Sequence, residues 1–147
     1  MTLVELLVVL GVIGLIVGMG VPALTQYARR VRLKATTRQV VGLVSLARSL
    51  AISSHQEHAV VVDQEERQIR VVNTASGEPL EQVVHLPSSV SVDMEVGGQP
   101  AAESQFAFRP TGSLTGRTVS LVLADGERQQ TIMVTGTTGA VAVQKSP

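Results

Sequence analysis

The sequence contains no cysteine and no tryptophan, and its aromatic residues are limited to Tyr27, Phe106 and Phe108. Without cysteine, a disulfide scaffold, a zinc site with thiolate ligands and a cysteine nucleophile are all excluded. Charged residues make up only 16% of the 147 residues, and 12 basic residues balance 12 acidic ones. Zero net charge argues against a generally cationic nucleic-acid binder. The length predicts one domain, or one domain with an appendage, and an apolar content of 44% is too high for a disordered chain.

The charges are distributed unevenly along the chain. Residues 1–28 hold a single charged side chain, that of Glu5. Residues 29–48 hold six basic residues and no acidic one, whereas residues 49–147 hold six basic and eleven acidic residues. An apolar end, a basic collar and an acidic body indicate a role at a membrane or in an assembly.

The apolar end is long enough to enter a membrane. Residues 6–28 form a run of 23 residues without a charge. As a helix, such a run spans roughly 35 Å, and the hydrocarbon core of a bilayer is about 30 Å thick. A secretory signal peptide has a basic start and a shorter apolar run, and the sequence has neither. We therefore predict a membrane-inserting helix for residues 1–28.

Two features of this segment are unusual for a simple anchor. Glu5 is an ionisable residue next to hydrocarbon, where such residues are costly and usually functional. Gly14 and Gly18 have the four-residue spacing that lets helices approach closely, and Pro22 removes a backbone donor from the same helix. We expect this segment to pack against other helices and to loosen locally.

The run MTLVELLVVL at residues 1–10, followed by Pro22, resembles the mature amino terminus of type IV pilins and type II secretion pseudopilins. In that family a prepilin peptidase removes a short basic leader, and the new terminal amine is methylated. The resemblance aligns Met1 with the first mature residue, where phenylalanine is usual. It implies a single pass through the inner membrane, a head in the periplasm or outside, and incorporation into a pseudopilus or surface filament.

The same resemblance implies that Met1, Glu5, Gly14, Gly18 and Pro22 act in assembly. When a subunit docks, its Met1 ammonium would be an uncompensated charge in a dry core, and the Glu5 carboxylate of a neighbour can neutralise it. The alternative is that Glu5 only neutralises Met1 of its own helix, one turn away. The implied partners are copies of the chain, other pilin-like subunits, prepilin peptidase, the assembly platform of the machinery and membrane lipid.

Residues 29–53 are predicted to form an amphipathic stem helix. Its apolar face has helical spacing and consists of Val40, Leu43, Val44, Ala47, Leu50 and Ala51. Arg30, Lys34 and Arg38 form a basic stripe at every fourth position on the opposite side. Three interpretations of this stripe stay open: a solvated helix face, contact with lipid phosphates or acidic neighbouring heads, and binding to a DNA backbone.

Residues 54–147 are predicted to form a β-rich globular head. Val90, Val92, Met94 and Val96 alternate with polar residues, as in a half-buried strand. Comparable runs occupy residues 58–63, 68–73, 82–86, 118–123, 131–135 and 140–144, and the dipeptide at residues 125–126 is a hairpin signal. The predicted fold class is α+β: a long N-terminal amphipathic and transmembrane helix packed on a small antiparallel β-sandwich, as in pilins.

A second resemblance is carried by the head. The run ARSLAI at residues 47–52, leading into the strand at 58–63, is similar to the helix-to-strand junction of the H-type minor pseudopilins, the GspH/FimT class. The run FAFRPTG at residues 106–112, with GAV at residues 139–141, resembles the carboxy-terminal signature of that class. Together the two resemblances cover most of the chain.

The sequence offers no convincing catalytic or metal site. His55 and His58 flank Glu57, but no third ligand is near in sequence, so we interpret them as exposed residues at the junction of helix and strand. Ser113 stands outside any G-x-S-x-G pattern, and no phosphate-binding loop or dinucleotide fingerprint is present. We predict that the chain is not an enzyme and needs no cofactor.

Three functional hypotheses are compatible with these residues. The preferred one is a structural subunit, a minor pseudopilin of a type II secretion pseudopilus. The second is a major subunit of a type IV pilus-like filament. The third is a membrane-tethered minor pilin that binds DNA or a substrate, although the segment 139–147 has only one cation, Lys145, and phosphate binding needs a cluster.

Overall fold

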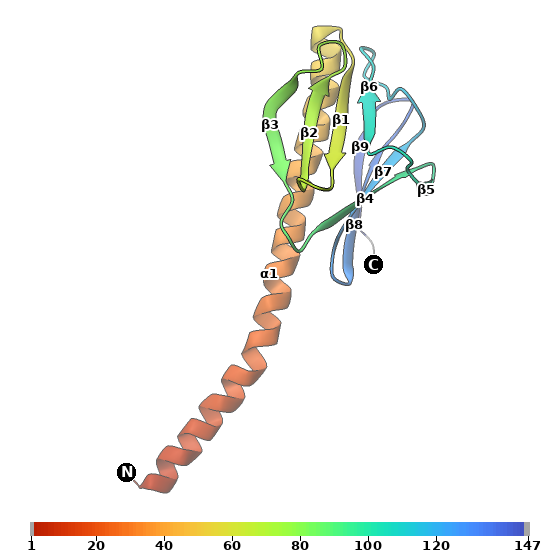
Figure 1. Ribbon diagram of the computed structural model, residues 1–147. Coiled ribbons are helices and arrows are strands. Elements are labelled where there is room, and N and C mark those ends of the chain that lie inside the picture. The colour runs from red at the N-terminus through yellow and green to blue at the C-terminus, as the bar shows by residue number, and fades with distance from the viewer. Residues whose placement is uncertain (1, 146–147) are drawn as a thin grey trace. The chain divides into compact units, whose positions relative to one another are not determined.

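The structure is a computed structural model that describes residues 2–145, without the side chains of residues 17, 19–24, 81 and 145. The chain divides into two compact units, Met1–Arg32 and Leu33–Pro147. Along the described residues, one helix precedes nine strands (Figure 1): α1 (Leu3–Ser54), β1 (His58–Asp63), β2 (Gln68–Asn73), β3 (Pro79–His85), β4 (Ser91–Val96), β5 (Gln99–Pro100), β6 (Gln105–Phe108), β7 (Val119–Asp125), β8 (Arg128–Val134) and β9 (Val141–Lys145).

Within the second unit, α1 contributes one apolar face to the core. The buried apolar residues of this face follow helical spacing and are Leu33, Val40, Leu43, Val44, Ala47 and Ala51. Thr36 and Thr37 are buried on the same helix, and the Thr37 hydroxyl donates a hydrogen bond of 2.8 Å to the Leu33 carbonyl. The predicted apolar face begins at Val40, whereas the buried face in the structure begins at Leu33. The difference arises because Thr36 and Thr37 are polar, so they break the apolar pattern in the sequence, yet both are buried.

The helix ends where its last carbonyl groups find side-chain donors. The hydroxyls of Ser53 and Ser54 both donate to the Leu50 carbonyl, and His55 adopts a left-handed φ of 56° directly after the last helical residue. His55 is exposed as predicted, but the prediction that His58 is exposed is wrong. His58 is 5% exposed, because β1 begins with this residue and its Nδ1 lies 3.1 Å from the Gln56 carbonyl.

Two antiparallel sheets build the rest of the second unit (Figure 1). The first has the order β3-β2-β1-β6, and the second has the order β5-β4-β7-β8-β9. The predicted hairpin after β7 is confirmed, but its two-residue turn is Gly126-Glu127 rather than Asp125-Gly126, because Asp125 pairs with Arg128. β1 and β2 have the predicted bounds. β3 begins at Pro79 rather than residue 82, and β6 is a short strand that the sequence pattern did not indicate.

The helix and both sheets share one core. Alternate residues of β7 are buried, and β1, β2, β4 and β8 add buried aliphatic side chains that face the same interior. Phe106 and Phe108 of β6 pack edge to face with ring centroids 5.9 Å apart. An α+β fold in which the helix packs on an antiparallel β head is therefore confirmed.

Candidate assembly surface

The first turn of α1 is closed by Thr2 and Glu5. The Thr2 amide donates to Glu5 Oε2 at 3.3 Å, and the Glu5 amide donates to Thr2 Oγ1 at 3.3 Å. This reciprocal pair is a capping box, in which each side chain satisfies a backbone donor that the helix leaves open. Glu5 is exposed, and its carboxylate lies at the positive end of the helix dipole. Met1, its predicted partner, lies outside the described residues.

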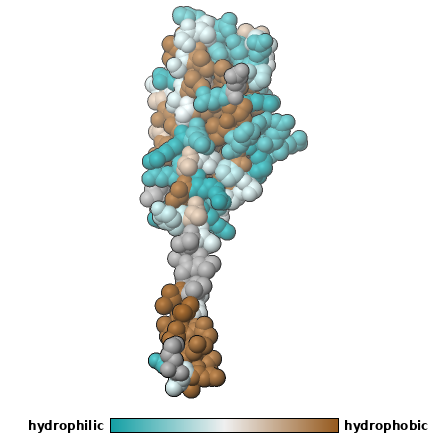
Figure 2. Space-filling model, turned by 90° about the vertical axis from the view of Figure 1, so that its left-hand side faces the viewer, coloured by the Kyte–Doolittle hydropathy of each residue, from teal (hydrophilic) through white to brown (hydrophobic). Residues whose placement is uncertain are grey.

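The helix that follows is apolar on every side. Its exposed fractions run from 50% at Leu6 and Val9 to 77% at Leu3, and Figure 2 shows apolar side chains gathered at this end. The exposed large apolar residues of this segment are Leu3, Val4, Leu6, Leu7, Val8, Val9, Leu10, Val12, Ile13, Leu15 and Ile16. A contiguous apolar surface of this kind marks a site of contact with another apolar phase.

The predicted close-approach glycines lie on this same open surface. A Cβ atom added at Gly14 or Gly18 would meet no atom within 4 Å. α1 continues through residue 22, but the side chain of Pro22 lies outside the described side chains. In the part of the chain that the structure describes, no helix is both long enough and apolar enough to cross a membrane. The membrane-inserting role of residues 1–28 stays a prediction from the sequence.

The three residues of the predicted basic stripe are exposed. Arg30 belongs to the first unit, and Lys34 and Arg38 belong to the second. The ion pair found among residues 2–145 joins two other residues, Arg70 and Asp63. The stripe is thus accessible, and its partner stays a matter of prediction.

The residues that carry the second resemblance meet at one point of the second unit, around Arg48. Arg48 Nε donates a 3.1 Å hydrogen bond to the Gly112 carbonyl, and Arg48 Nη2 donates a 3.0 Å bond to the Thr138 carbonyl. The helix is thereby tied to the loop after β6 and to the turn before β9. The guanidinium suits this task, because it offers several donors in a fixed planar arrangement.

Two glycines at this junction allow the backbone segments to touch. Gly112 has a φ of +81° and Gly139 a φ of +63°, and both values lie in the left-handed region. A Cβ atom on Gly139 would collide with the Gly112 carbonyl oxygen and would come within 3.0 Å of Arg48 Nε. The runs at residues 47–52, 106–112 and 139–141 are therefore parts of one packed joint.

The chain matches one known family over more than half of its length. The family is described as type II transport protein GspH, and the match covers residues 36–138. The chain belongs to the GspH family. The match begins after the apolar segment of α1, so the GspH assignment rests on the stem and the head.

Solved structures share the fold of this GspH chain. The type IV minor pilin FimU of Pseudomonas aeruginosa has a TM-score of 0.64 at 14% identity, over 82% of this chain and 92% of FimU. The minor pseudopilin EpsH of the type II secretion system of Vibrio cholerae has a TM-score of 0.64 at 15% identity, over 79% of this chain and 97% of EpsH. GspH of E. coli has a TM-score of 0.58 at 17% identity, over 78% and 89%. No curated protein sequence matches the chain.

Two features were not predicted from the sequence. They are the capping role of Thr2 and the Arg48 clasp, by which we mean the two hydrogen bonds from Arg48 to the Gly112 and Thr138 carbonyls. The first had a visible signal, because threonine followed three residues later by glutamate, before an apolar run, is the pattern of a capping box. The second had none, because Arg48 contacts residues 64 and 90 positions away. Among the described residues, no group of three His, Cys, Asp or Glu side chains gathers to hold a metal ion.

Proposed function

We propose that this chain is a minor pseudopilin of a type II secretion pseudopilus and joins the filament through its apolar N-terminal helix. The observation that carries the proposal is the exposure of apolar side chains on every face of residues 3–16 in a member of the GspH family. Such a surface is stable only when hydrocarbon or other helices cover it. Before assembly the cover is the inner membrane, and in the filament it is the helices of neighbouring subunits.

Glu5 sets the register of docking in this proposal. Its Oε2 accepts the hydrogen bond from the Thr2 amide, which leaves Oε1 to accept from another group. The ammonium of Met1 from an incoming subunit, methylated after prepilin peptidase has removed a leader, supplies that group. An uncompensated charge in the apolar interior of a filament costs several kcal/mol, roughly 3–5, so the pair selects one axial position.

The glycines and Pro22 act on the same helix. Gly14 and Gly18 let a neighbouring helix approach closely, since no side chain occupies the space above them. Pro22 removes one amide donor, which lowers the cost of opening the helix when the subunit leaves the membrane. Arg30, Lys34 and Arg38 contact lipid phosphates while the head stays in the periplasm.

A second candidate is a minor pilin of a type IV pilus. The likeness to FimU, which is such a pilin, favours this candidate as strongly as the likeness to EpsH favours the first. The two differ in the filament that contains the chain. Mass spectrometry of sheared filaments from the native host distinguishes them by the identity of the major subunit found with this chain.

The docking role of Glu5 is tested by comparing two substitutions. Glu5→Gln keeps the capping box, because glutamine serves at this position as well as glutamate, but it removes the charge. Thr2→Ala weakens the cap and keeps the charge. We expect Glu5→Gln to remain in the membrane and to be lost from filaments, while Thr2→Ala still assembles.

The measurement is the amount of chain in the membrane and in sheared filaments, by immunoblot. Normal incorporation of Glu5→Gln would show that the carboxylate only caps its own helix. Loss of both variants from the membrane would mean that the first turn is needed for insertion, and the docking role would then be wrong.

A further inference from the structure

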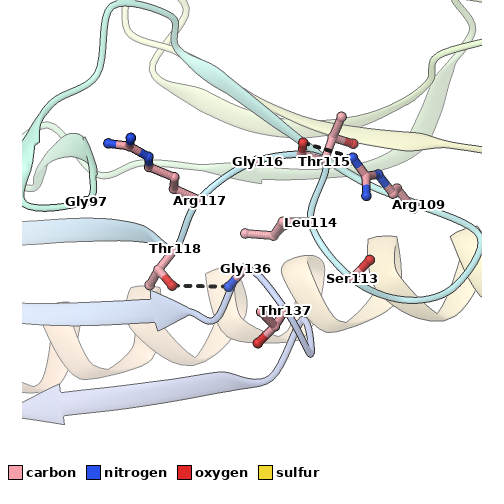
Figure 3. Close-up of a pocket in the computed structure, with 10 residues that line it drawn as sticks. All are labelled: Gly97, Arg109, Ser113, Leu114, Thr115, Gly116, Arg117, Thr118, Gly136 and Thr137. Atoms are coloured by element: carbon pink, nitrogen blue, oxygen red, sulfur yellow. Dashed lines mark hydrogen bonds between the residues drawn. The ribbon is translucent and has the colours of Figure 1, made fainter.

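An open groove of about 620 Å³ lies in the head around the loop between β6 and β7 (Figure 3). Its walls come from three places: the turn between β4 and β5, the β6–β7 loop itself, and the turn between β8 and β9. The residues that line it are Gly97, Arg109, Ser113, Leu114, Thr115, Gly116, Arg117, Thr118, Gly136 and Thr137. None of the roles assigned above uses this groove.

The charge of the groove is opposite to that of the head around it. Residues 49–147 carry eleven acidic and six basic residues, whereas the residues that line the groove include two arginines and no Asp or Glu. One carboxylate borders the lining, because Thr115 Oγ1 donates a 2.7 Å hydrogen bond to Glu57 Oε1. Hydroxyl groups supply most of the remaining polar lining. Figure 3 shows Arg109 and Arg117 at two separate positions along the β6–β7 loop. An anionic ligand would therefore contact two guanidinium groups at two separate points, and the two groups would not bind the same anionic group together.

The donors of the groove are only partly used within the chain. Arg109 Nη2 donates a 3.3 Å hydrogen bond to the Thr115 carbonyl. Arg117 is exposed, and among the groups that the structure describes its guanidinium has neither a hydrogen bond nor an ion pair. The side chain of Arg117 does rest on Gly97, where a Cβ atom would lie 3.8 Å from its Cδ.

The loop that carries these donors is fixed in place by backbone hydrogen bonds. The Leu114 amide donates to the Gly136 carbonyl at 2.9 Å, and the Thr115 amide donates to the Ala107 carbonyl at 2.9 Å. The Gly136 amide donates to Thr118 Oγ1 at 3.2 Å, as Figure 3 shows. A Cβ atom on Gly136 would come within 2.9 Å of the Gly116 carbonyl oxygen, so the two turns are in close contact. A ligand that binds here orders little of the protein, which favours affinity.

We propose that this groove binds an extended acidic segment of a neighbouring subunit, with its carboxylates on Arg109 and Arg117. The inference rests on the proposed function, because it takes another pilin-like subunit as the partner. Guanidinium groups bind carboxylates through charge-assisted hydrogen bonds, and hydroxyls along the groove accept or donate to a peptide backbone. Heads with a net negative charge repel one another, and a basic groove supplies the local attraction that orients two of them.

A nucleic acid fits the groove less well than a peptide. Its binding requires several cations along the phosphate backbone and aromatic side chains for the bases, and the groove lining offers two cations and no aromatic residue. The acidic surplus of the head adds repulsion toward a polyphosphate. A peptide with spaced carboxylates meets fewer of these obstacles.

The test is direct binding of two anionic probes to the full-length chain in detergent micelles. The probes are a fluorescent decaglutamate peptide and a fluorescent ten-nucleotide single-stranded DNA, and the readout is fluorescence anisotropy. The variants are Arg109→Gln and Arg117→Gln. The matched control is Arg128→Gln, which removes an exposed cation of the same head outside the groove lining.

We expect decaglutamate to bind, Arg117→Gln to weaken binding about tenfold, and Arg128→Gln to leave it unchanged. Tenfold is the loss that removal of one charge-assisted hydrogen bond produces. An equal loss in Arg128→Gln, or no binding at all, would overturn the inference. Tighter binding of the DNA with the same dependence on Arg117 would replace the peptide by a nucleic acid and would also overturn it.

A second measurement separates this inference from the proposed function. Arg117→Glu is compared with Glu5→Gln for incorporation into filaments. If Glu5→Gln is lost from filaments while decaglutamate fails to bind, the filament role stands and the groove inference is wrong. If decaglutamate binds and Arg117→Glu is incorporated normally, the neighbouring subunit is not the ligand, and the inference is again wrong.

Discussion

Arg48 is the residue at which three separate stretches of the second unit come together. Its two hydrogen bonds end on backbone carbonyls of the β6–β7 loop and of the β8–β9 turn, so it satisfies acceptors that neither sheet uses. A methionine at this position would keep most of the apolar packing of the side chain but none of the donors. The contribution of Arg48 is therefore measurable apart from its bulk.

We predict that Arg48→Met lowers the free energy of unfolding by about 1.5–3 kcal/mol, the contribution of one hydrogen bond from a charged group. The part-buried bond to Gly112 supplies this contribution, because the bond to Thr138 is exposed and adds little. Urea denaturation followed by circular dichroism measures the change. Arg38→Met is the control, because Arg38 is exposed on the same helix. A similar loss in both variants would mean that the effect comes from helix propensity and not from the clasp.

Gly139 supports the same joint through its lack of a side chain. Gly139→Ala introduces a Cβ that collides with the Gly112 carbonyl, at a φ that side chains rarely adopt, and we expect a loss of about 3 kcal/mol or more. Gly77 is a matched control, because its φ is +71° but nothing lies within 4 Å of an added Cβ. Gly77→Ala is therefore expected to lower the free energy of unfolding by only about 1 kcal/mol, the cost of placing alanine at a positive φ without a collision. Equal losses in thermal unfolding would contradict the collision.

At the scale of elements, α1 of the second unit acts as a core element as much as a stem. Leu43 is 1% exposed and lies in the middle of its buried face, so Leu43→Ala is predicted to cost about 2–5 kcal/mol through the cavity that it leaves. Val143→Ala on β9, where the side chain is 49% exposed, should cost less than about 1 kcal/mol. The midpoints of urea denaturation give both values, and a mild effect at Leu43 would show that the helix is not part of the core.

The sequence was informative about elements with a regular period and uninformative about their junctions. Val60, Val62, Ile69 and Val71 follow the alternation that defined β1 and β2, and those bounds were correct. β6 was not predicted, because it has only four residues, and the run of residues 106–108 is too short to show a regular alternation of apolar and polar residues. Local patterns also predicted assembly roles for Glu5 and for Gly14 and Gly18, and these roles stay predictions. The groove depends on residues from three separate turns and has no local pattern.

At the scale of the whole molecule, the second unit carries the whole described core. Every buried residue of the hydrophobic cluster lies at Leu33 or later. A chain that begins at Leu33 should therefore fold, with a melting temperature within about 5 °C of the full chain in the same detergent, equivalent to about 1 kcal/mol. Differential scanning calorimetry measures both. Loss of a cooperative transition in the shortened chain would show that the first unit stabilises the head.

The clasp made by Arg48 also has a consequence for the order in which the chain closes on itself. The donor lies at the end of the helix, and its second acceptor, Thr138, lies 90 residues later. Contacts between residues so far apart in sequence form late in folding. Closing the long loop between them loses conformational entropy before the contact contributes any favourable free energy. During synthesis the joint can close only after Thr138 has left the ribosome, which is later than the helix and the first sheet. A product that stops before Thr138 therefore lacks one of the two acceptors of Arg48, and the end of its helix is held by fewer hydrogen bonds.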